Sequence, residues 1–337
     1  MKNKYLVIDM QHHFIPAEAL KLVGKTDEHD FTYGLSRFKR EYEQMVSVAE
    51  HLEWMDNSGI DMAILSTSSF SANGHDFCRA VNDGYSKLVR EYPDRFRGMI
   101  HFYPFADAHK TKDEIKRGVE ELGLWGIAAV TSFQDLTIDA PIMNHIYEMA
   151  LKYDMPVFVH PTIRMKLWGG ERYDLFMTLA REYDIVKSFV EMFYGVLPKF
   201  PELKIIMSHL GGGLPILKGR LLAWHRPESF PLPENVPRRG GLAINQATEV
   251  GLVSDFESRV RNVYFDSAGY GGWLPAIRSA METLGPHRTC FATDFPYELN
   301  DSKYVKQYIQ EIYALEVSEE DKRNFLGNNL KELFKIS

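Results

Sequence analysis

Five polar side chains follow short apolar segments at widely separated places in this sequence. Three are histidines, one is an aspartate and one is a glutamine: His13, His160, His209, Asp294 and Gln11. Imidazole and carboxylate groups that meet in one pocket suit a divalent transition metal such as zinc. A single histidine at a strand end is more often a hydrogen-bonded core or loop residue. Three imidazoles and a carboxylate at four strand ends favour a shared metal site.

The segments before these residues are short, nearly all apolar and bounded by polar or turn residues, which is typical of parallel strands buried on both faces. We predict eight strands: Tyr5–Met10, Met62–Ser66, Gly98–Tyr103, Gly126–Thr131, Pro156–His160, Lys204–Ser208, Val263–Asp266 and Thr289–Thr293. Apolar residues at helical spacing predict helices between them: Glu41–Ser58, Asp76–Tyr92, Asp113–Leu122, Pro141–Tyr153, Leu214–Trp224, Gly272–Leu284 and Ser302–Ala314.

This alternation over 337 residues predicts an α/β fold, a (β/α)8 TIM barrel that forms one domain over residues 1–337. The alternative is a doubly wound open sheet, which usually has a glycine-rich turn after its first strand. Here the first strand runs instead into Gln11, His12 and His13. In a barrel the carboxyl ends of the strands converge on one mouth, so the five polar side chains are expected to meet there.

Residues that are two positions apart on a strand lie on the same face, so we expect Gln11 and His13 to point the same way. His12 is expected to point the other way and to pack between strand and helix. We expect His101, inside the third strand, to be core, and His75 to be either surface or part of the mouth. The other histidines are expected at the surface: His29, His51, His109, His145, His225 and His287.

Three segments are longer than ordinary loops, and such loops are often functional. They are Phe14–Arg40, Thr162–Glu182 and His225–Asp255. The first two are predicted insertions after strands 1 and 5 of the barrel, at the face where sites are built. A further helix, Ser318–Lys335, carries leucines and a phenylalanine on one face, which predicts that it docks on the body.

Composition narrows the classes of function. The hydrophobic share of 45% is ordinary for a soluble globular protein. The net charge of −7 argues against a nucleic-acid or anionic-membrane partner. Cys78 and Cys290 are too few for a disulfide framework and suit a reducing cytoplasm. The first residues place charge and histidine where a signal peptide has its apolar core, and no apolar run reaches membrane-spanning length. We therefore expect a cytoplasmic protein.

The segment IDMQHHFIP resembles the IDxHxHxxP opening of the amidohydrolase superfamily. The later segments VHP, MSHLGGGLP, YFDSAG, FATDFPYE and FLGNNLKELF are similar, in the same order, to one branch of it. That branch includes aminocarboxymuconate semialdehyde decarboxylase and the related aromatic-acid decarboxylases. The resemblance covers essentially the whole chain.

The resemblance implies a role for each of the five polar residues. His13 and the position of Gln11 would be metal ligands from strand 1, and His160 would be the ligand from strand 5. Asp294 would bind the metal and exchange protons with the substrate or with water. His209 would be the catalytic histidine, acting near its ordinary titration range. The family, together with the long segments, also implies a homodimer.

Gln11 departs from the family pattern, which usually has histidine there. A neutral amide oxygen is a weaker ligand for zinc than an imidazole or a carboxylate. Three interpretations follow. His13, His160 and Asp294 hold the ion, with Gln11 as a distant or weak ligand; or the site prefers a harder metal such as manganese; or tight metal binding has been lost.

The branch favours a metal-dependent decarboxylase of a small, aromatic or unsaturated, carboxylic acid. One divalent ion is implied, zinc in the first place and manganese as the other candidate. The same residues would serve a hydrolase of a lactone or amide, and a weakened metal site would leave a non-catalytic ligand-binding barrel. Arg164 could pair with the substrate carboxylate or lie at the surface. Asp266 is expected to support either the metal or His209.

Overall fold

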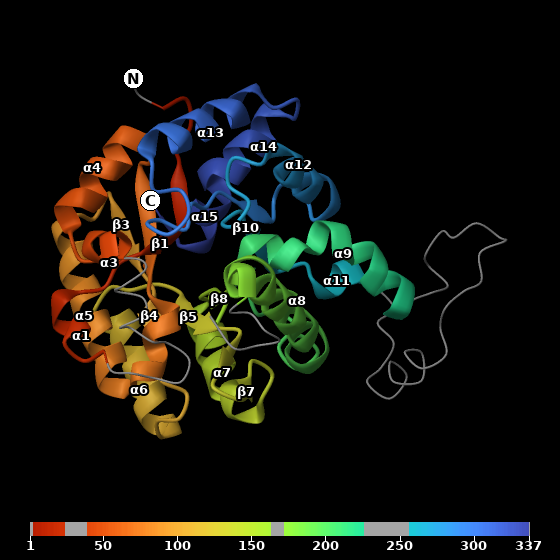
Figure 1. Ribbon diagram of the computed structural model, residues 1–337. Coiled ribbons are helices and arrows are strands. Elements are labelled where there is room, and N and C mark those ends of the chain that lie inside the picture. Colours follow the sequence, from red (N-terminus) through yellow and green to blue (C-terminus); the bar gives the residue numbers. More distant parts are fainter. Residues whose placement is uncertain (1–2, 24–38, 163–171, 226–255, 337) are drawn as a thin grey trace.

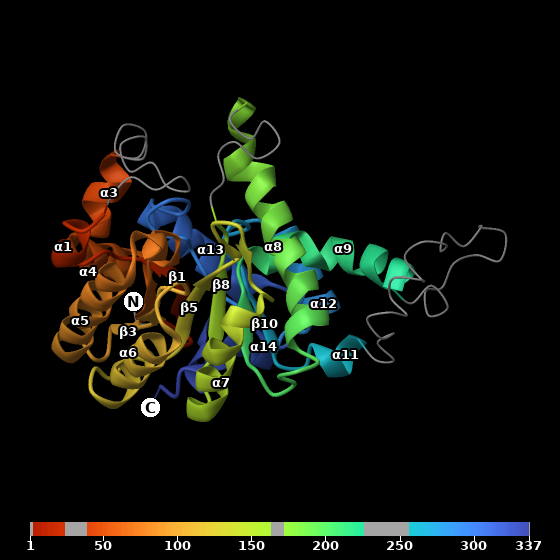
Figure 2. The same cartoon turned by 90° about the horizontal axis from the view of Figure 1, so that it is seen from below.

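The computed structural model describes residues 3–23, 39–162, 172–225 and 256–336. Within these ranges the chain forms an α/β fold with parallel strands in the middle and helices around them (Figures 1 and 2). The strands of the parallel sheets are β1 (Ile8–His13), β2 (Met62–Ser66), β3 (Phe96–Gly98), β4 (Ile100–His101), β5 (Ile127–Val130), β8 (Val157–His160), β9 (Ile205–Met207), β10 (Val263–Asp266) and β11 (Thr289–Cys290).

The parallel strands form two sheets, with the orders β1-β2-β3 and β11-β10-β9-β8-β5-β4. At one junction only Met99 separates β3 from β4, and its backbone N–H donates to Leu65 O at 3.1 Å. At the other junction β1 lies beside the segment after β11. There the N–H of Met10 donates to Phe291 O at 3.0 Å, and that of His13 donates to Phe295 O at 2.8 Å. The two sheets therefore adjoin at both ends.

The strands separate two apolar clusters, as alternating side chains require. Val7, Ala63 and Leu65 belong to the larger cluster, which lies between the strands and the surrounding helices. The smaller cluster gathers one or more side chains from most of the strands: Ile8, Met10, Met62, Ile64, Ala128, Phe158, Ile206 and Cys290. It is covered by Leu330 and Leu333 of α15 (Asn329–Leu333) and by Phe334, all buried. The predicted docking of the last helix is thus confirmed.

The helices around the sheets begin and end as follows: α1 (Ala17–Leu20), α3 (Lys39–Met45), α4 (Val48–Ser58), α5 (His75–Glu91), α6 (Ala108–Glu120), α7 (Asn144–Tyr153), α8 (Arg181–Glu191), α9 (His209–His225), α11 (Phe256–Arg259), α12 (Leu274–Thr283), α13 (Ser302–Ala314) and α14 (Glu319–Arg323). Short 3₁₀ helices cover Ser68–Asn73, Pro141–Met143 and Arg172–Asp174, and π turns cover Phe176–Ala180, Met192–Val196 and Asn324–Asn328.

Several predicted boundaries were wrong because local or tertiary hydrogen bonds set them. The helix expected over Glu41–Ser58 is two helices, since the Ser47 hydroxyl caps α4 by accepting the N–H of Glu50 at 3.4 Å. The first strand is Ile8–His13 instead of Tyr5–Met10, because its pairing with β2 and the segment after β11 carries it past the apolar run. Gln11, His12 and His13 therefore lie within the strand.

Other differences are smaller. The strand expected over Gly98–Tyr103 is divided between β3 and β4 at Met99, and β11 ends at Cys290. A short antiparallel hairpin, β6 (Ser132–Phe133) with β7 (Leu136–Thr137), was not predicted. The last helix is interrupted by the π turn between α14 and α15.

The three long segments lie partly outside the described residues. The structure leaves out residues 24–38 of Phe14–Arg40 and 163–171 of Thr162–Glu182, and of His225–Asp255 it describes only the first residue. After the 3₁₀ turn, in which Tyr173 and Asp174 have positive φ, residues 175–182 are helical and run into the first turn of α8.

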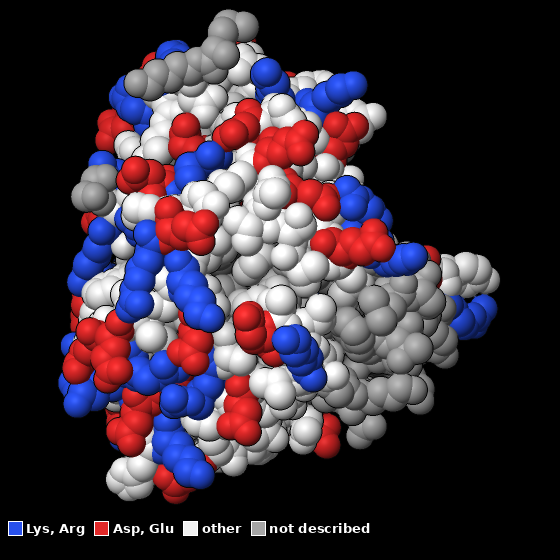
Figure 3. Space-filling model, turned by 90° about the vertical axis from the view of Figure 1, so that its left-hand side faces the viewer, with Lys and Arg blue, Asp and Glu red and all other residues white. Residues whose placement is uncertain are grey.

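The face formed by α5 and α6 carries both signs of charge side by side (Figure 3). Arg79 and Arg117 both pair with Glu114, at 2.7 and 2.6 Å, and Arg117 also pairs with Asp83 at 2.6 Å. Opposite charges paired in this way give the face no broad field of one sign. Within the described part of the chain, none of the helices has both the length and the apolar character needed to span a membrane.

Candidate metal centre

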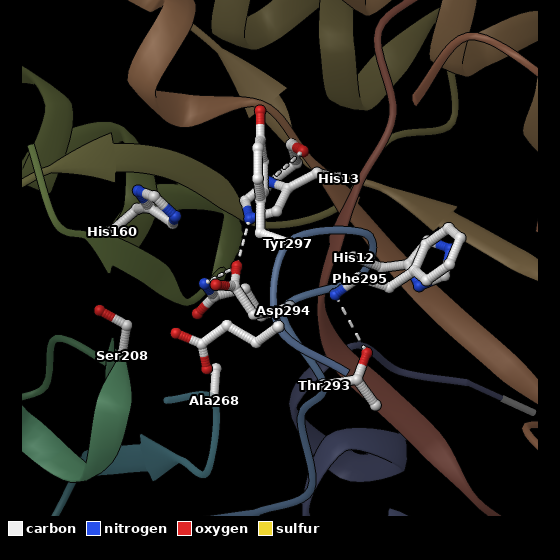
Figure 4. A network of polar contacts seen from close by, with 12 residues as sticks. His12, His13, His160, Ser208, Ala268, Thr293, Asp294, Phe295 and Tyr297 are labelled. Atoms are coloured by element: carbon white, nitrogen blue, oxygen red, sulfur yellow. Dashed lines mark hydrogen bonds and ion pairs between the residues drawn. The ribbon is translucent and has the colours of Figure 1, made fainter. Parts of the chain in front are cut away.

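Three of the five predicted side chains converge where β1, β8 and the turn after β11 meet. One ligand atom from each of His13, His160 and Asp294 lies within 4.8 Å of the other two, and all three residues are buried. Nε2 of His13 is 2.8 Å from Oδ1 of Asp294. Figure 4 shows the three side chains around one space. Two imidazoles and a carboxylate at this spacing form a set that can hold a divalent metal ion.

The hydrogen bonds of the two imidazoles fix which nitrogen faces that space. Nδ1 of His13 lies 3.2 Å from Ser66 O, and Nδ1 of His160 lies 2.8 Å from Pro161 O. A carbonyl oxygen only accepts, so each Nδ1 carries a hydrogen, and each Nε2 is the nitrogen that faces the space. Nε2 of His13 donates to Asp294 there, in the position that a metal ion would take. Burial lowers the pKa of His160 well below its usual value, which keeps this imidazole neutral. The residues present therefore fit a metal ion.

Asp294 is held ionised despite its burial. Burial alone would raise its pKa, but the hydrogen bond and charge of His13 and the nearby Arg181 hold it below its usual range. Its backbone φ is 57°, in the left-handed region, which turns the side chain back toward β1.

Gln11 lies against the same ligand atoms. Its Nε2 donates to Oδ1 of Asp294 at 2.7 Å and lies 3.5 Å from Nε2 of His209. Its Oε1 is buried and has no hydrogen-bond partner among the described residues. An amide can exchange the places of its oxygen and nitrogen by rotation, which would bring an oxygen toward the metal ligands. The Gln11 side chain is thus close enough to serve as a neutral oxygen ligand.

His209 starts α9, and only Ser208 separates it from the end of β9. The backbone conformation at this point is unusual. The φ of His209 is 52°, and the next four residues, Leu210 to Gly213, also have positive φ, between 49° and 81°. The glycines allow this left-handed turn at low cost. The backbone N–H of His209 donates to Oδ1 of Asp266 at 3.1 Å.

The ring of His209 is paired with a carboxylate that sequence reasoning missed. Nδ1 lies 2.7 Å from Oε1 of Glu182, in the first turn of α8. Burial lowers the pKa of His209, but the charge and hydrogen bond of Glu182, together with the charge of Glu298, outweigh it and raise the pKa to about 9. The expected ordinary titration range is thus corrected upward. The pairing depends on α8 packing against α9, and no local motif in the sequence indicates it.

A buried arginine, also missed, completes this side of the site. Arg181 forms an ion pair with Glu298, and its Nη1 is 4.0 Å from Oδ2 of Asp294. Its Nε is buried and makes no hydrogen bond among the described residues. Arg164, the predicted substrate-binding residue, lies outside the described residues.

Asp266, at the end of β10, supports the backbone of His209 and not its ring. Its Oδ1 accepts the N–H groups of His209 and Ala268, at 3.1 and 3.0 Å. Burial raises the pKa of this carboxyl to about 7. Its Oδ2 is buried without a partner among the described residues.

The histidines outside the centre were predicted with mixed success. His12 packs between β1 and α4, as expected, and His101 is core. His51 and His145 were expected at the surface, and this was wrong, since both are buried. His51 is drawn inside by a hydrogen bond to His12, which its helical position alone does not reveal.

A family model described as Amidohydrolase matches residues 8–336, so the chain belongs to this family. Among its relatives is gamma-resorcylate decarboxylase from Polaromonas sp., 26% identical over 98% of both chains. Another is 2-amino-3-carboxymuconate-6-semialdehyde decarboxylase from Dictyostelium discoideum, 25% identical over 83% of this chain and 74% of that one.

The fold is shared with a solved structure of 5-carboxyvanillate decarboxylase from Novosphingobium aromaticivorans. The TM-score is 0.81 at 23% identity, over 99% of this chain and 97% of that one. That protein was crystallised with manganese and 4-hydroxy-3-methoxy-5-nitrobenzoic acid. The resemblance seen in the sequence to the decarboxylase branch of the superfamily is therefore confirmed.

Proposed function

We propose that this protein is a metal-dependent decarboxylase of a small aromatic or unsaturated carboxylic acid. The observation that carries the proposal is the convergence of His13, His160 and Asp294. His209 lies next to this triad, since Nε2 of Gln11 contacts both Asp294 and His209. The names of the two relatives described above, both decarboxylases, support the reaction and the class of substrate.

We also propose that the two sheets form one closed (β/α)8 barrel, a single domain spanning residues 1–337, with insertions after β1 and β8. The backbone hydrogen bonds from Met10 to Phe291 and from His13 to Phe295 support closure on one side. The continuity of β3 into β4 through Met99 supports it on the other. Closure matters for function, because it places the carboxyl ends of β1, β8 and β11 at one mouth.

One divalent metal ion would be held by His13, His160 and Asp294, with Gln11 as a fourth, weaker ligand. When bound, such an ion acts as a Lewis acid toward an oxygen of the substrate. We predict zinc as the bound ion, because two of the ligands are imidazoles, and manganese is the alternative. The oxygens of Asp294 and Gln11 suit manganese, which is also bound in the 5-carboxyvanillate decarboxylase structure.

His209 is the residue that would move a proton. The pairing with Glu182 keeps its ring protonated at neutral pH and leaves Nε2, the atom facing Gln11, as the donor. In decarboxylation the C–C bond to the carboxylate breaks, CO2 leaves, and the electron pair stays on the ring carbon. A proton from Nε2 of His209 would then complete the new C–H bond.

Two arginines are candidates for the substrate carboxylate. Arg164 remains a prediction from the sequence. Arg181 is buried beside Asp294, and its Nε makes no hydrogen bond within the described part of the chain, although it lies 3.5 Å from Oε1 of Glu182. A buried guanidinium next to the triad supports an anion-binding role.

The product distinguishes decarboxylation from hydrolysis. Purified protein, loaded separately with manganese and zinc, should release CO2 from members of a panel of hydroxybenzoates and unsaturated acids. If it instead opened lactones or amides and released no CO2, the proposal would be wrong. Elemental analysis of protein purified without chelator tests the metal itself, and an absence of metal with no turnover would favour a ligand-binding barrel.

We further propose a cytoplasmic homodimer. The two cysteines, Cys78 and Cys290, are buried and free, which suits a reducing compartment. Light scattering of the purified protein would test the dimer, and cell fractionation would test the location.

A further inference from the structure

His12 lies on the face of β1 opposite His13 and belongs to a second buried network. Its Nδ1 is 2.9 Å from Oδ2 of Asp9, and its Nε2 is 2.8 Å from Nδ1 of His51. The three residues are almost completely buried. Figure 4 shows His12 pointing away from Asp294 and lying against Phe295. The rings of His12 and Phe295 are stacked, with their centroids 4.9 Å apart.

The network ends on the backbone of two other segments. On one side, Nε2 of His51 donates to Gln44 O in α3 at 3.0 Å. On the other side, Asp9 accepts both the N–H of Thr293, at 2.9 Å, and its hydroxyl, at 2.6 Å. The network therefore ties β1 both to the α3–α4 pair and to the turn that carries Asp294.

The hydrogens of the network can be counted. Gln44 O only accepts, so Nε2 of His51 carries a hydrogen. The hydrogen bond between Asp9 and His12 needs a second hydrogen, and the one between His12 and His51 needs a third. Three hydrogens on one carboxylate and two imidazoles make the group electrically neutral as a whole, which is what its burial requires.

We propose that Asp9 is a positioning residue that sets the approach of Asp294 to His13 in the metal centre. His12 and Thr293 are the residues directly before these two ligands, and Asp9 joins them. The backbone contacts of β1 with Phe291 and Phe295 lie on either side of Thr293, and Asp9 holds the stretch between them. The inference rests on the proposed metal centre.

A metal site tolerates errors of only about 0.2 Å in its ligand distances. Groups that orient the ligands typically account for about 10–100-fold in metal affinity. Removing the carboxylate in Asp9→Ala frees Thr293 from β1 and should weaken metal binding by about 10–100-fold.

Asp9→Asn provides the rescue. Its amide oxygen can accept the N–H of Thr293. Its amide nitrogen can donate one hydrogen to Nδ1 of His12 and the other to the hydroxyl of Thr293, which then accepts instead of donating. His12 can then donate from Nε2 to His51, and His51 to Gln44, so every link is remade with two neutral imidazoles. Asp9→Asn should therefore keep most of the affinity that Asp9→Ala loses.

The test is titration of the metal-free full-length protein with MnCl2 and ZnCl2 alone, followed by calorimetry, together with the Tm of each variant. Glu114→Ala is the matched control, because Glu114 is a buried carboxylate paired with arginines on the outer helices. It should lower the Tm and leave the metal affinity unchanged.

Each outcome has a definite meaning. Wild-type affinity in Asp9→Ala, with only the Tm lowered, overturns the positioning role, as does an Asp9→Asn variant that binds as weakly as Asp9→Ala. If Asp9→Ala does not fold, Thr293→Val replaces it: reduced affinity supports the proposal and unchanged affinity overturns it. A wild-type protein that binds neither metal overturns the metal centre itself.

Discussion

The carboxylate of Glu182 lies 2.7 Å from Nδ1 of His209, although 27 positions separate the two residues in the sequence. His209 is completely buried, and burial alone would make its imidazole neutral. The charge and hydrogen bond of Glu182, with the charge of Glu298, reverse this and raise the pKa of His209 to about 9. His209 is therefore protonated below that pH and loses its proton as the pH rises through it.

Replacing Glu182 tests this relationship. Glu182→Gln removes the charge and keeps the shape, so the pKa of His209 should fall. If the protonated ring is the proton donor, the alkaline limb of the kcat–pH profile should move about one to two pH units lower, which is the worth of a charged hydrogen bond. A limb that stays in place would show that His209 is not the titrating donor.

His209→Ala should separate proton transfer from metal binding. Turnover should fall by about 10²–10⁴-fold, the usual contribution of a general acid. Metal content should stay close to that of the wild type, because His209 contacts Gln11 and is not in the triad of candidate ligands. Steady-state kinetics and elemental analysis on the same preparation check both, and full activity would exclude the assigned role.

Asp294→Ala should lose metal and activity together, because Asp294 is the carboxylate of the triad and contacts both His13 and Gln11. The measurement is metal content after dialysis against excess MnCl2 or ZnCl2. Retention of stoichiometric metal would contradict its place as a ligand.

Gln11→His tests the departure from the family pattern. A second imidazole on the same face of β1 should tighten zinc binding, because imidazole is a better ligand for zinc than an amide oxygen. Zinc and manganese affinities, measured side by side, should shift in favour of zinc. If the substitution also created activity where the wild type had none, the wild type would be a ligand-binding barrel.

Gly212→Ala tests the left-handed turn that places His209. The φ of Gly212 is 68°, and an added Cβ would lie 2.2 Å from Glu182 O. We expect a loss of stability of about 2–4 kcal/mol from backbone strain and overpacking together. Gly123→Ala is the control, since its φ is 70° with open space around the Cβ, so only the strain remains. Equal losses by chemical denaturation would show that the contact with α8 does not matter.

The parallel strands could be predicted from the sequence, apart from some of their boundaries, because they are buried on both faces and stand out as apolar runs. The sequence also identified His13, His160 and Asp294, since a polar residue at the end of such a run is conspicuous. Their convergence follows from parallel strands having their carboxyl ends at one edge.

Residues whose role depends on helix packing could not be found in this way. Glu182 and Arg181 lie in a helix with ordinary polar spacing, and only the packing of α8 on α9 brings Glu182 to His209. His51 looked like a surface residue because its partner, His12, is 39 positions away on another element. Local pattern carries no information about such long-range pairs.

The bond between His13 and Asp294 spans 281 positions of the sequence. One candidate ligand is therefore synthesised 281 residues before the other. A nascent chain that has not yet extended past Asp294 offers only the two imidazoles and the Gln11 amide, and a chain released before that point lacks the carboxylate. Stable capture of a metal at these residues would thus mark a chain whose synthesis has passed Asp294 and in which β1 has met the turn after β11.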